Sequence, residues 1–292
     1  MRILVFGKTG QVGMGLSRHL QGLGKIAVMG RQDADVRDLS AIESVIAEYR
    51  PDVIINAAAY TAVDKAESDV ATAELVNAKA PRVMAEMAET TGAVLIHYST
   101  DYVFSGRAHQ PYREDAQPHP LNVYGDTKLR GEQAVRETAS KYLILRTSWV
   151  YSSHGRNFFK TMVRLAGEQK ALRVVDDQYG SPTYAGYLSA ATAELVRQFA
   201  ESGGLPPEHT GIYHMSCSGI TSWYGFAKEI LKQMQLNEVR VVPISTSEYP
   251  TPATRPVYSV LDNARLADTF AIRLKSWQDG LRQCLADAPV GP

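Results

Sequence analysis

The feature that most constrains the fold is the alternation of short apolar runs with longer amphipathic stretches in the first half of the chain. The runs are rich in valine, isoleucine and leucine and are almost continuously apolar, as expected for parallel strands buried on both faces. Five segments have this character: residues 2–7, 25–30, 52–59, 93–100 and 142–151. Repeated strand–helix–strand units predict a parallel sheet covered by helices.

The stretches between the runs have the period of amphipathic helices. Residues 39–50 place their apolar side chains on one stripe, and Pro51 ends the segment. Residues 127–139 fill the last gap in the same way. We therefore predict an α/β fold with a Rossmann-type, doubly wound parallel sheet, whose ligands bind at the carboxyl ends of the strands.

The rhythm loosens after about residue 150. A helix is expected over 157–169, and it is followed by turn-rich residues 172–184 and a proline-rich segment, 247–259. We predict that residues 1–150 form a dinucleotide-binding domain. Residues 151–292 are expected to form mainly a smaller α/β lobe that binds the substrate, with some segments returning to the sheet.

Charge and apolar content exclude several classes of partner. Lys+Arg and Asp+Glu both number 31, and this balance does not favour binding to duplex nucleic acid or to anionic membranes. No apolar run approaches the length of a membrane span, and the N-terminus enters a strand without the pattern of a signal peptide. We expect a cytoplasmic protein with no nucleic-acid or membrane partner. The composition leaves the oligomeric state open, and a homodimer is one option.

Other catalytic classes lack their motifs. The two cysteines have no metal-ligand or disulfide spacing, and the seven histidines form no metal-binding pair with a carboxylate. No GxSxG motif of an α/β-hydrolase is present. We therefore expect no catalytic metal.

A glycine-rich turn follows the first predicted strand. The sequence GKTGQVG places glycines at Gly7, Gly10 and Gly13, ahead of a predicted helix. Glycines at such a turn let backbone N–H groups approach a pyrophosphate at a helix N-terminus. Glycines also occur in ordinary strand–helix turns, but the position after the first strand of an alternating α/β chain favours nucleotide binding.

Three polar groups converge on the same predicted edge. Tyr124 and Lys128 lie one helical turn apart, so their side chains leave the same face of the helix. A nearby ammonium group favours the phenolate and lowers the pKa of a tyrosine. Thr100 ends the fourth strand, and the small residues Ala57–Ala59 follow Asn56 at the end of the third. Each feature is common alone; together the hydroxyl, phenol and ammonium groups are predicted to surround one carbonyl carbon. The small residues either admit a flat cofactor ring or simply pack tightly.

These features together resemble the extended short-chain dehydrogenase/reductase superfamily. The longer stretches FGKTGQVG, RPDVIINAAAYTAVDKAES, HYSTDYVFSG, PLNVYGDTKLRGE, RTSWVY, DDQYGSPT and YPTPATRP are similar to the dTDP-4-dehydrorhamnose reductase family over nearly the whole chain. The resemblance implies NAD(P)H-dependent reduction of the C4 keto group of dTDP-4-dehydro-6-deoxy-L-mannose to dTDP-L-rhamnose. That is the last step in making a sugar donor for cell-envelope polysaccharides such as lipopolysaccharide O-antigen.

The resemblance also implies roles for individual residues. Tyr124 would donate the proton, Lys128 would tune it and anchor the nicotinamide ribose, and Thr100 would bind the substrate oxygen. The implied cofactor-binding residues are Gly7, Gly10, Gln11, Val12, Gly13, Arg31, Asp35, Val36, Ala59, Tyr60, Thr61, Tyr98, Tyr124 and Lys128. The implied substrate-binding residues are Thr100, Asp101, Trp149, Asn157 and Arg255.

One departure from the family concerns the cofactor. Family members often have an acidic residue at the end of the second strand, where this chain has Gly30–Arg31. An arginine can bind the 2′-phosphate of NADPH, whereas an acid repels it. Arg31 can also simply face solvent, and Asp33 and Asp35 nearby reduce the positive field. We expect NADPH to be preferred, with NADH also usable.

Three other functions use related sequences. Sugar-nucleotide 4,6-dehydratases typically carry an acidic pair after the threonine, whereas Asp101 is followed here by Tyr102. The regulatory subunit of methionine adenosyltransferase resembles these reductases without being known for their reaction. Another sugar-nucleotide reductase or epimerase is the third alternative. The presence of Thr100, Tyr124 and Lys128 argues against a purely regulatory role.

Overall fold

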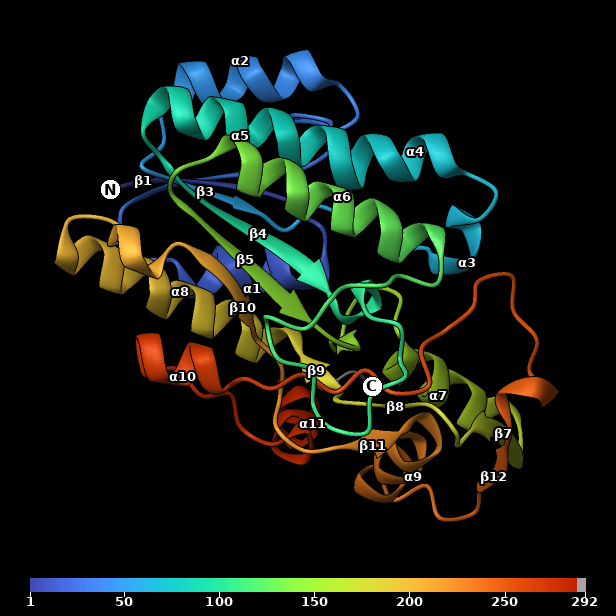
Figure 1. Ribbon diagram of the computed structural model, residues 1–292. Coiled ribbons are helices and arrows are strands. Elements are labelled where there is room, and N and C mark those ends of the chain that lie inside the picture. The colour runs from blue at the N-terminus through green and yellow to red at the C-terminus, as the bar shows by residue number, and fades with distance from the viewer. Residues whose placement is uncertain (288–292) are drawn as a thin grey trace.

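The computed structural model describes residues 1–287, and its centre is a six-stranded sheet in the order β10-β5-β4-β3-β1-β2 (Figure 1). All neighbouring strands in it are parallel. The strands are β1 (Arg2–Phe6), β2 (Lys25–Met29), β3 (Val53–Asn56), β4 (Val94–Thr100), β5 (Tyr142–Thr147) and β10 (Gly211–His214). The predicted class, α/β with a doubly wound parallel sheet, is confirmed.

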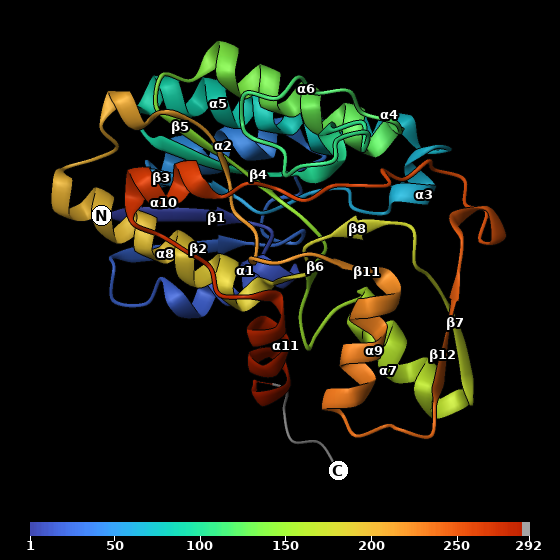
Figure 2. The ribbon, with the colours of Figure 1, turned by 60° about the horizontal axis from the view of Figure 1, so that its bottom comes forward.

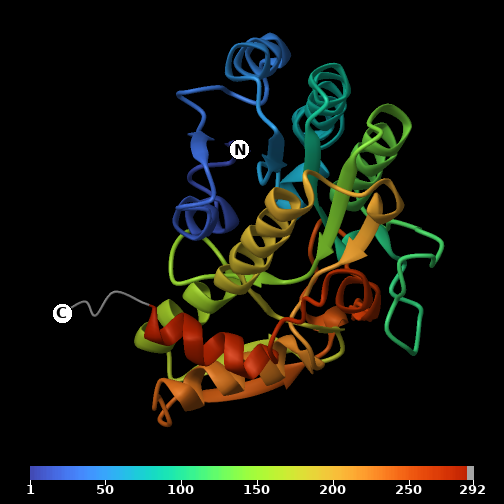
Figure 3. The ribbon, with the colours of Figure 1, turned by 90° about the vertical axis from the view of Figure 1, so that its left-hand side faces the viewer.

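Helices cover both faces of this sheet. They are α1 (Gln11–His19), α2 (Leu39–Tyr49), α5 (Ala80–Thr91), α6 (Val123–Thr138) and α8 (Ala185–Ser202). Helices α2, α5 and α6 lie on one face, and α1 and α8 lie on the other (Figures 1 and 3). Strand β1 shows why two cores form: Ile3 and Val5 pack on the α8 side, whereas Leu4 and Phe6 pack on the α5 side. Successive strand residues point to opposite faces, so a fully apolar strand serves both cores.

The strand order creates a crevice for a ligand. Strand β1 lies between β2 and β3, so the chain leaves β1 toward one side and returns to β3 on the other. The loops after β1 and β3 therefore diverge, and an α/β sheet binds its ligand at this switch point.

Local signals fix the helix that carries the tyrosine–lysine pair. Helix α6 begins at Val123, which agrees with the predicted placement of Tyr124 and Lys128 in its first turns, and the Asn122 side chain caps it by accepting a hydrogen bond from the Gly125 amide at 2.8 Å. Tyr124 and Lys128 thus lie in its first two turns. Helix α2 ends as predicted, with Arg50 in the left-handed region just before Pro51.

A second apolar core lies beyond the carboxyl edge of the sheet (Figure 2). Its elements are β6 (Val150–Tyr151), α7 (Phe158–Glu168), β7 (Ala171–Val175), β9 (Thr183–Tyr184), α9 (Trp223–Gln233), β12 (Arg240–Ile244) and α11 (Trp277–Ala286). Strand β7 pairs in parallel with β12, and β6 pairs in parallel with β9. The division at residue 150 stays a prediction, and residues 288–292 of the predicted lobe lie outside the described residues. Helix α8 and strand β10 belong to the central sheet layer.

The remaining elements are short. They are α3 (Val63–Ala66), α4 (Val70–Glu74), the π-helix η1 (Leu75–Lys79), the 3₁₀ helices η2 (Asp101–Val103), η3 (Pro207–His209) and η4 (Thr246–Glu248), the strands β8 (Tyr179–Gly180) and β11 (Thr221–Ser222), and α10 (Ala264–Phe270). Within residues 1–287, no helix combines the length and apolar character needed to cross a membrane.

Two predicted strands were too long. The predicted strand 52–59 ends at Asn56, and the next residues form a loop. The predicted strand 142–151 ends at Thr147 and resumes as β6, because Trp149 adopts a left-handed backbone with φ of 47°. This kink turns the chain away from the sheet toward the second core.

Candidate active site

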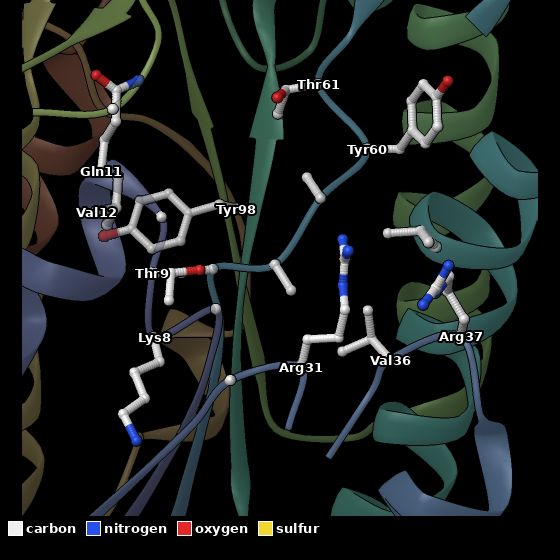
Figure 4. Close-up of a pocket in the computed structure, with 18 of the residues that line it drawn as sticks. Lys8, Thr9, Gln11, Val12, Arg31, Val36, Arg37, Tyr60, Thr61 and Tyr98 are labelled. Carbon is white, nitrogen blue, oxygen red and sulfur yellow. The ribbon is translucent and has the colours of Figure 1, made fainter. Parts of the chain in front are cut away.

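A pocket of about 720 Å³ opens at the carboxyl ends of β1, β2, β3 and β4 (Figure 4). The predicted site residues that line it are Gly7, Gly10, Gln11, Val12, Arg31, Asp35, Val36, Ala59, Tyr60, Thr61, Tyr98, Tyr124 and Lys128. The tertiary structure thus places the glycine-rich loop and the tyrosine–lysine pair on the walls of one cavity.

The glycine-rich loop forms a cradle that side chains would fill. Gly7 has φ of +104°, and a Cβ there would lie 2.7 Å from the carbonyl carbon of Ala57. A Cβ on Gly13 would lie 2.0 Å from the Gly7 oxygen, so Gly13 packs α1 against the loop rather than lining the pocket. Helix α1 begins with no side-chain cap at Gly10, which leaves its first N–H groups available to an anion. This cradle fits a pyrophosphate.

The opposite end of the pocket carries an arginine without an acidic partner. Asp33 pairs with Lys8 at 3.2 Å, and Asp35 pairs with Arg37 at 2.5 Å. The pKa of Asp33 is lowered mainly by the Gly30 amide, and the pKa of Asp35 mainly by the Arg37 guanidinium. Among residues 1–287, Arg31 forms no ion pair, and its guanidinium extends into the pocket beside Arg37 (Figure 4). Both acids that were expected to weaken the field of Arg31 thus have closer partners, and the Arg31 charge makes a smaller contribution to lowering the pKa of Asp35.

The tyrosine–lysine pair has an electrostatic arrangement different from the predicted one. Burial raises the pKa of Tyr124 to about 12, opposed in part by a hydrogen bond with Thr100 and reinforced by Asp101. The Lys128 ammonium instead donates to the Tyr98 carbonyl oxygen at 2.6 Å and lies 3.3 Å from Nε2 of His97. Burial also lowers the pKa of Lys128 to about 8. Desolvation dominates the pKa of Tyr124 in this structure, and the Lys128 ammonium binds other groups. That Lys128 tunes Tyr124 stays a prediction.

Thr100 and Asp101 are buried, and neither is among the residues that line this pocket. The Thr100 hydroxyl donates to Oδ1 of Asp101 at 3.1 Å and accepts from the Tyr102 amide at 3.2 Å. Asp101 is only 1% exposed, and its Oδ2 has no hydrogen-bond partner within the described residues. Burial raises the pKa of Asp101 to about 7.

The other predicted substrate residues also lie outside the pocket lining. Trp149 stacks on Trp223 with ring centroids 3.5 Å apart. Arg255 pairs with Asp64 at 2.7 Å. These side chains already have protein partners, so the structure places them near the carboxyl edge without assigning them a ligand.

Gln11 and Asn157 bind each other. The Asn157 amide donates to Oε1 of Gln11 at 2.7 Å, while Nε2 of Gln11 donates to the Val150 carbonyl at 3.2 Å. Asn157 also caps α7 by accepting from the Lys160 amide at 2.9 Å. The Gln11 side chain therefore ties the glycine-rich loop to the segment before α7, which leaves its backbone to face the pocket.

Several pocket residues were missed from the sequence. They include Lys8, Thr9, Arg37, Gly155 and Arg156. Lys8 and Thr9 lie within the glycine-rich motif, and Arg37 directly follows the predicted Asp35–Val36, so their positions carried a signal. Gly155 and Arg156 come from the loop before α7, and no local pattern marks that loop as a neighbour of β1.

No metal site is evident in the part of the chain that the structure describes. Residues 1–287 contain no cluster of three or more histidine, cysteine or acidic side chains that could hold an ion. The site residues are instead suited to binding a nucleotide along the glycine-rich loop and to donating a proton from Tyr124 to a bound carbonyl oxygen.

Comparison with known proteins identifies close relatives. The family model described as "RmlD substrate binding domain" matches residues 1–289. The dTDP-4-dehydrorhamnose reductase of Escherichia coli K12 is 45% identical over 98% of this chain and 97% of its own length. The enzyme of that name from Burkholderia thailandensis is 42% identical over 98% of this chain and 99% of its own.

A solved structure has the same fold. The crystal structure of dTDP-4-dehydrorhamnose reductase from Bacillus anthracis, in complex with NADP, superimposes with a TM-score of 0.90. It is 38% identical in sequence, and the match covers 98% of this chain and 99% of that chain.

Proposed function

Because this chain belongs to the dTDP-4-dehydrorhamnose reductase family, we propose that it is an oxidoreductase acting on a dTDP sugar. It uses NADPH to reduce the C4 keto group of dTDP-4-dehydro-6-deoxy-L-mannose to dTDP-L-rhamnose, the last step of dTDP-rhamnose synthesis. The observation that supports this proposal is that the glycine cradle and the Tyr124–Lys128 pair line the same pocket. NADH is also usable in the proposed reaction.

The chain's own groups perform the acid–base part of the reaction. When bound, NADPH supplies the hydride that C4 accepts. Tyr124 then delivers its phenolic proton to the alkoxide oxygen at C4. This oxygen accepts the proton readily because an alkoxide is a stronger base than a phenolate. Burial keeps Tyr124 protonated at neutral pH, since its pKa is about 12. The raised pKa therefore suits an acid that must start each turnover with its proton.

The remaining predicted residues keep their proposed roles. Gly7, Gly10 and the backbone of Gln11–Val12 would hold the pyrophosphate, and Arg31 with Val36 would lie at the adenosine end. Lys128 would bind the nicotinamide ribose. Thr100, Asp101 and Trp149 would contact the sugar, and Asn157 and Arg255 the nucleoside diphosphate. NADPH and nucleotide sugars are cytoplasmic metabolites, so we also propose a cytoplasmic location, and a homodimer remains the proposed assembly.

A coupled assay tests the function. Purified protein should oxidise NADPH stoichiometrically when dTDP-4-dehydro-6-deoxy-L-mannose is added, with dTDP-L-rhamnose as product. A dehydratase or a regulatory subunit would not consume the cofactor. Cofactor binding without consumption would refute the proposal.

Replacing Lys128 with methionine should affect both binding and turnover. The variant lacks the ammonium and so loses the proposed charge-assisted hydrogen bond to the ribose, worth roughly 1.5–3 kcal/mol. NADPH affinity should therefore fall about 10- to 100-fold. Turnover should fall as well, and the alkaline limb of the rate profile near pH 8, where Lys128 loses its charge, should disappear. Fluorescence titration and initial rates measure these quantities. Unchanged NADPH affinity would exclude the ribose contact.

Replacing Arg31 with alanine should change cofactor choice. Loss of one charge-assisted contact to the 2′-phosphate corresponds to roughly 1.5–3 kcal/mol, or about one to two decades in the ratio of kcat/KM for NADPH over NADH. Arg164→Ala, which removes an exposed arginine on α7, is the matched control and should leave the ratio unchanged. Better use of NADH by the wild type, or an unaltered ratio in Arg31→Ala, would contradict this assignment.

A further inference from the structure

A buried histidine lies directly behind the lysine of the active site. His97 on β4 is fully buried and faces Lys128 on α6, with 3.3 Å between Nε2 of the imidazole and Nζ of the lysine. On its other side, Nδ1 lies 3.0 Å from Nδ2 of Asn56, its register partner on β3. Lys128 and Asn56 are themselves only 2% and 1% exposed. When an imidazole lies between two buried polar groups, these groups determine which of its two nitrogens carries the proton.

The Asn56 amide determines where that proton lies. Its Oδ1 accepts a hydrogen bond from the Ala58 backbone N–H at 3.1 Å, so its NH₂ group is the end that faces His97. Nδ1 of His97 must then accept. Burial and the Lys128 charge lower the pKa of His97 well below its ordinary value, so the ring is neutral and carries one proton. That proton lies on Nε2, pointing at Lys128.

An Nε2–H group opposite Lys128 has an electrostatic consequence. An ammonium group has only donors, so a charged Lys128 faces a second donor, whereas a neutral amine can accept from Nε2–H and still donate to the Tyr98 carbonyl. We propose that His97 is a positioning residue for Lys128: held by Asn56 as the Nε2–H tautomer, it sets the pH at which Lys128 loses its charge. The catalytic consequence of this arrangement rests on the proposed function, but the tautomer itself does not.

The other charged groups around Lys128 act in known directions. Glu132, one turn further along α6, favours the ammonium form, and its carboxylate is itself paired with Arg146 of β5. The phenol of Tyr124 is neutral at physiological pH. Within the described residues, Lys128 Nζ lies in hydrogen-bond distance of one side chain, that of His97, and of one backbone carbonyl, that of Tyr98. Replacing His97 should therefore change the pH at which Lys128 loses its charge without altering α6, the helix that carries Lys128.

The tautomer can be observed directly in the free protein. The ¹⁵N chemical shifts of the imidazole nitrogens distinguish the two neutral tautomers. His97 should show a protonated Nε2 and a bare Nδ1 from pH 6 to 9. His214, a fully buried histidine on β10, is the internal control, because its Nδ1 lies 3.0 Å from the Tyr112 carbonyl and must donate to it. It should show the opposite tautomer. Loss of one set of signals in His97→Gln assigns the resonances.

The variant His97→Gln tests the effect on Lys128. Glutamine can turn its carbonyl oxygen toward Lys128 and accept from the ammonium, so the alkaline limb of kcat/KM should move up by roughly 1 to 2 pH units, as one charge-assisted hydrogen bond implies. His214→Gln also removes a buried imidazole and should leave the limb where it is. A general loss of stability would affect both variants, whereas the proposed role shifts the pH profile of His97→Gln and leaves that of His214→Gln unchanged.

Each outcome decides the proposal. An Nδ1–H tautomer or a doubly protonated ring at His97 overturns it, as does an unmoved alkaline limb in folded His97→Gln. If that variant does not fold, the wild-type tautomer still decides. Absence of reduction of the dTDP sugar by wild-type protein would refute the proposed function instead, while the tautomer and the pH dependence of NADPH binding would remain measurable.

Discussion

Replacing Tyr124 with phenylalanine should lower kcat by roughly 100- to 10,000-fold, the usual contribution of a positioned proton donor. The phenol lines the pocket, and the change removes a single oxygen while keeping the ring that packs edge-to-face on Tyr102. NADPH affinity should change little, because Lys128 keeps its bond to the Tyr98 carbonyl. Rapid mixing with saturating dTDP-4-dehydro-6-deoxy-L-mannose measures the chemical step.

Tyr213→Phe is the matched control for this experiment. Tyr213 is buried on β10, and its hydroxyl donates to the His209 carbonyl at 2.8 Å, outside the pocket. Its loss should reduce stability slightly and leave kcat unchanged. Near-normal turnover by folded Tyr124→Phe would remove Tyr124 from the role of proton donor.

Replacing Glu132 with alanine should destabilise the protein by about 3–5 kcal/mol, the cost of leaving a buried charge without its partner. Glu132 accepts from Nε and Nη2 of Arg146 at 2.8 and 2.6 Å, and from the Ser99 hydroxyl at 2.5 Å. The side chains of the ion pair are 2% and 1% exposed. Urea unfolding, monitored by circular dichroism, measures the change in the free energy of unfolding.

An exposed ion pair provides the control for burial. Glu168→Ala removes the partner of Arg164 on α7, where the side chains are 60% and 52% exposed, and should cost under about 1 kcal/mol. The double variant Glu132→Leu, Arg146→Met should recover most of the lost stability, because it removes both buried charges. Equal losses in Glu132→Ala and Glu168→Ala would show that burial does not control the energetics of the first pair.

Much of the fold was predictable because its determinants are local. Apolar runs that serve two cores predicted five strands of the sheet, and Pro51 marked the end of α2. The strand prediction for 142–151 was wrong because Trp149 adopts a left-handed backbone, and its ring stacks on Trp223, more than seventy residues away. Strand β10 joined the sheet from the second half of the chain, where no alternating pattern precedes it.

The candidate site was predictable to a similar extent. The glycine-rich loop and the i,i+4 spacing of Tyr124 and Lys128 are short-range features, and both line the pocket. The mutual binding of Gln11 and Asn157 was not predictable, since it joins loops that only folding brings together. His97 carried a weak signal, because a polar residue within a buried strand needs a partner, but the sequence did not indicate which one.

The sequence by itself determined which chemical groups leave the same face of α6 and which edge of the sheet they occupy. The helical repeat and the parallel direction of successive strands follow from residues close to one another in the chain. Only the tertiary structure decided the protonation of those groups, because the pKa values of Tyr124 and Lys128 depend on burial and on partners from β3 and β4. Desolvation is a property of the packed interior, to which distant segments contribute, and so a spacing of four residues cannot report it.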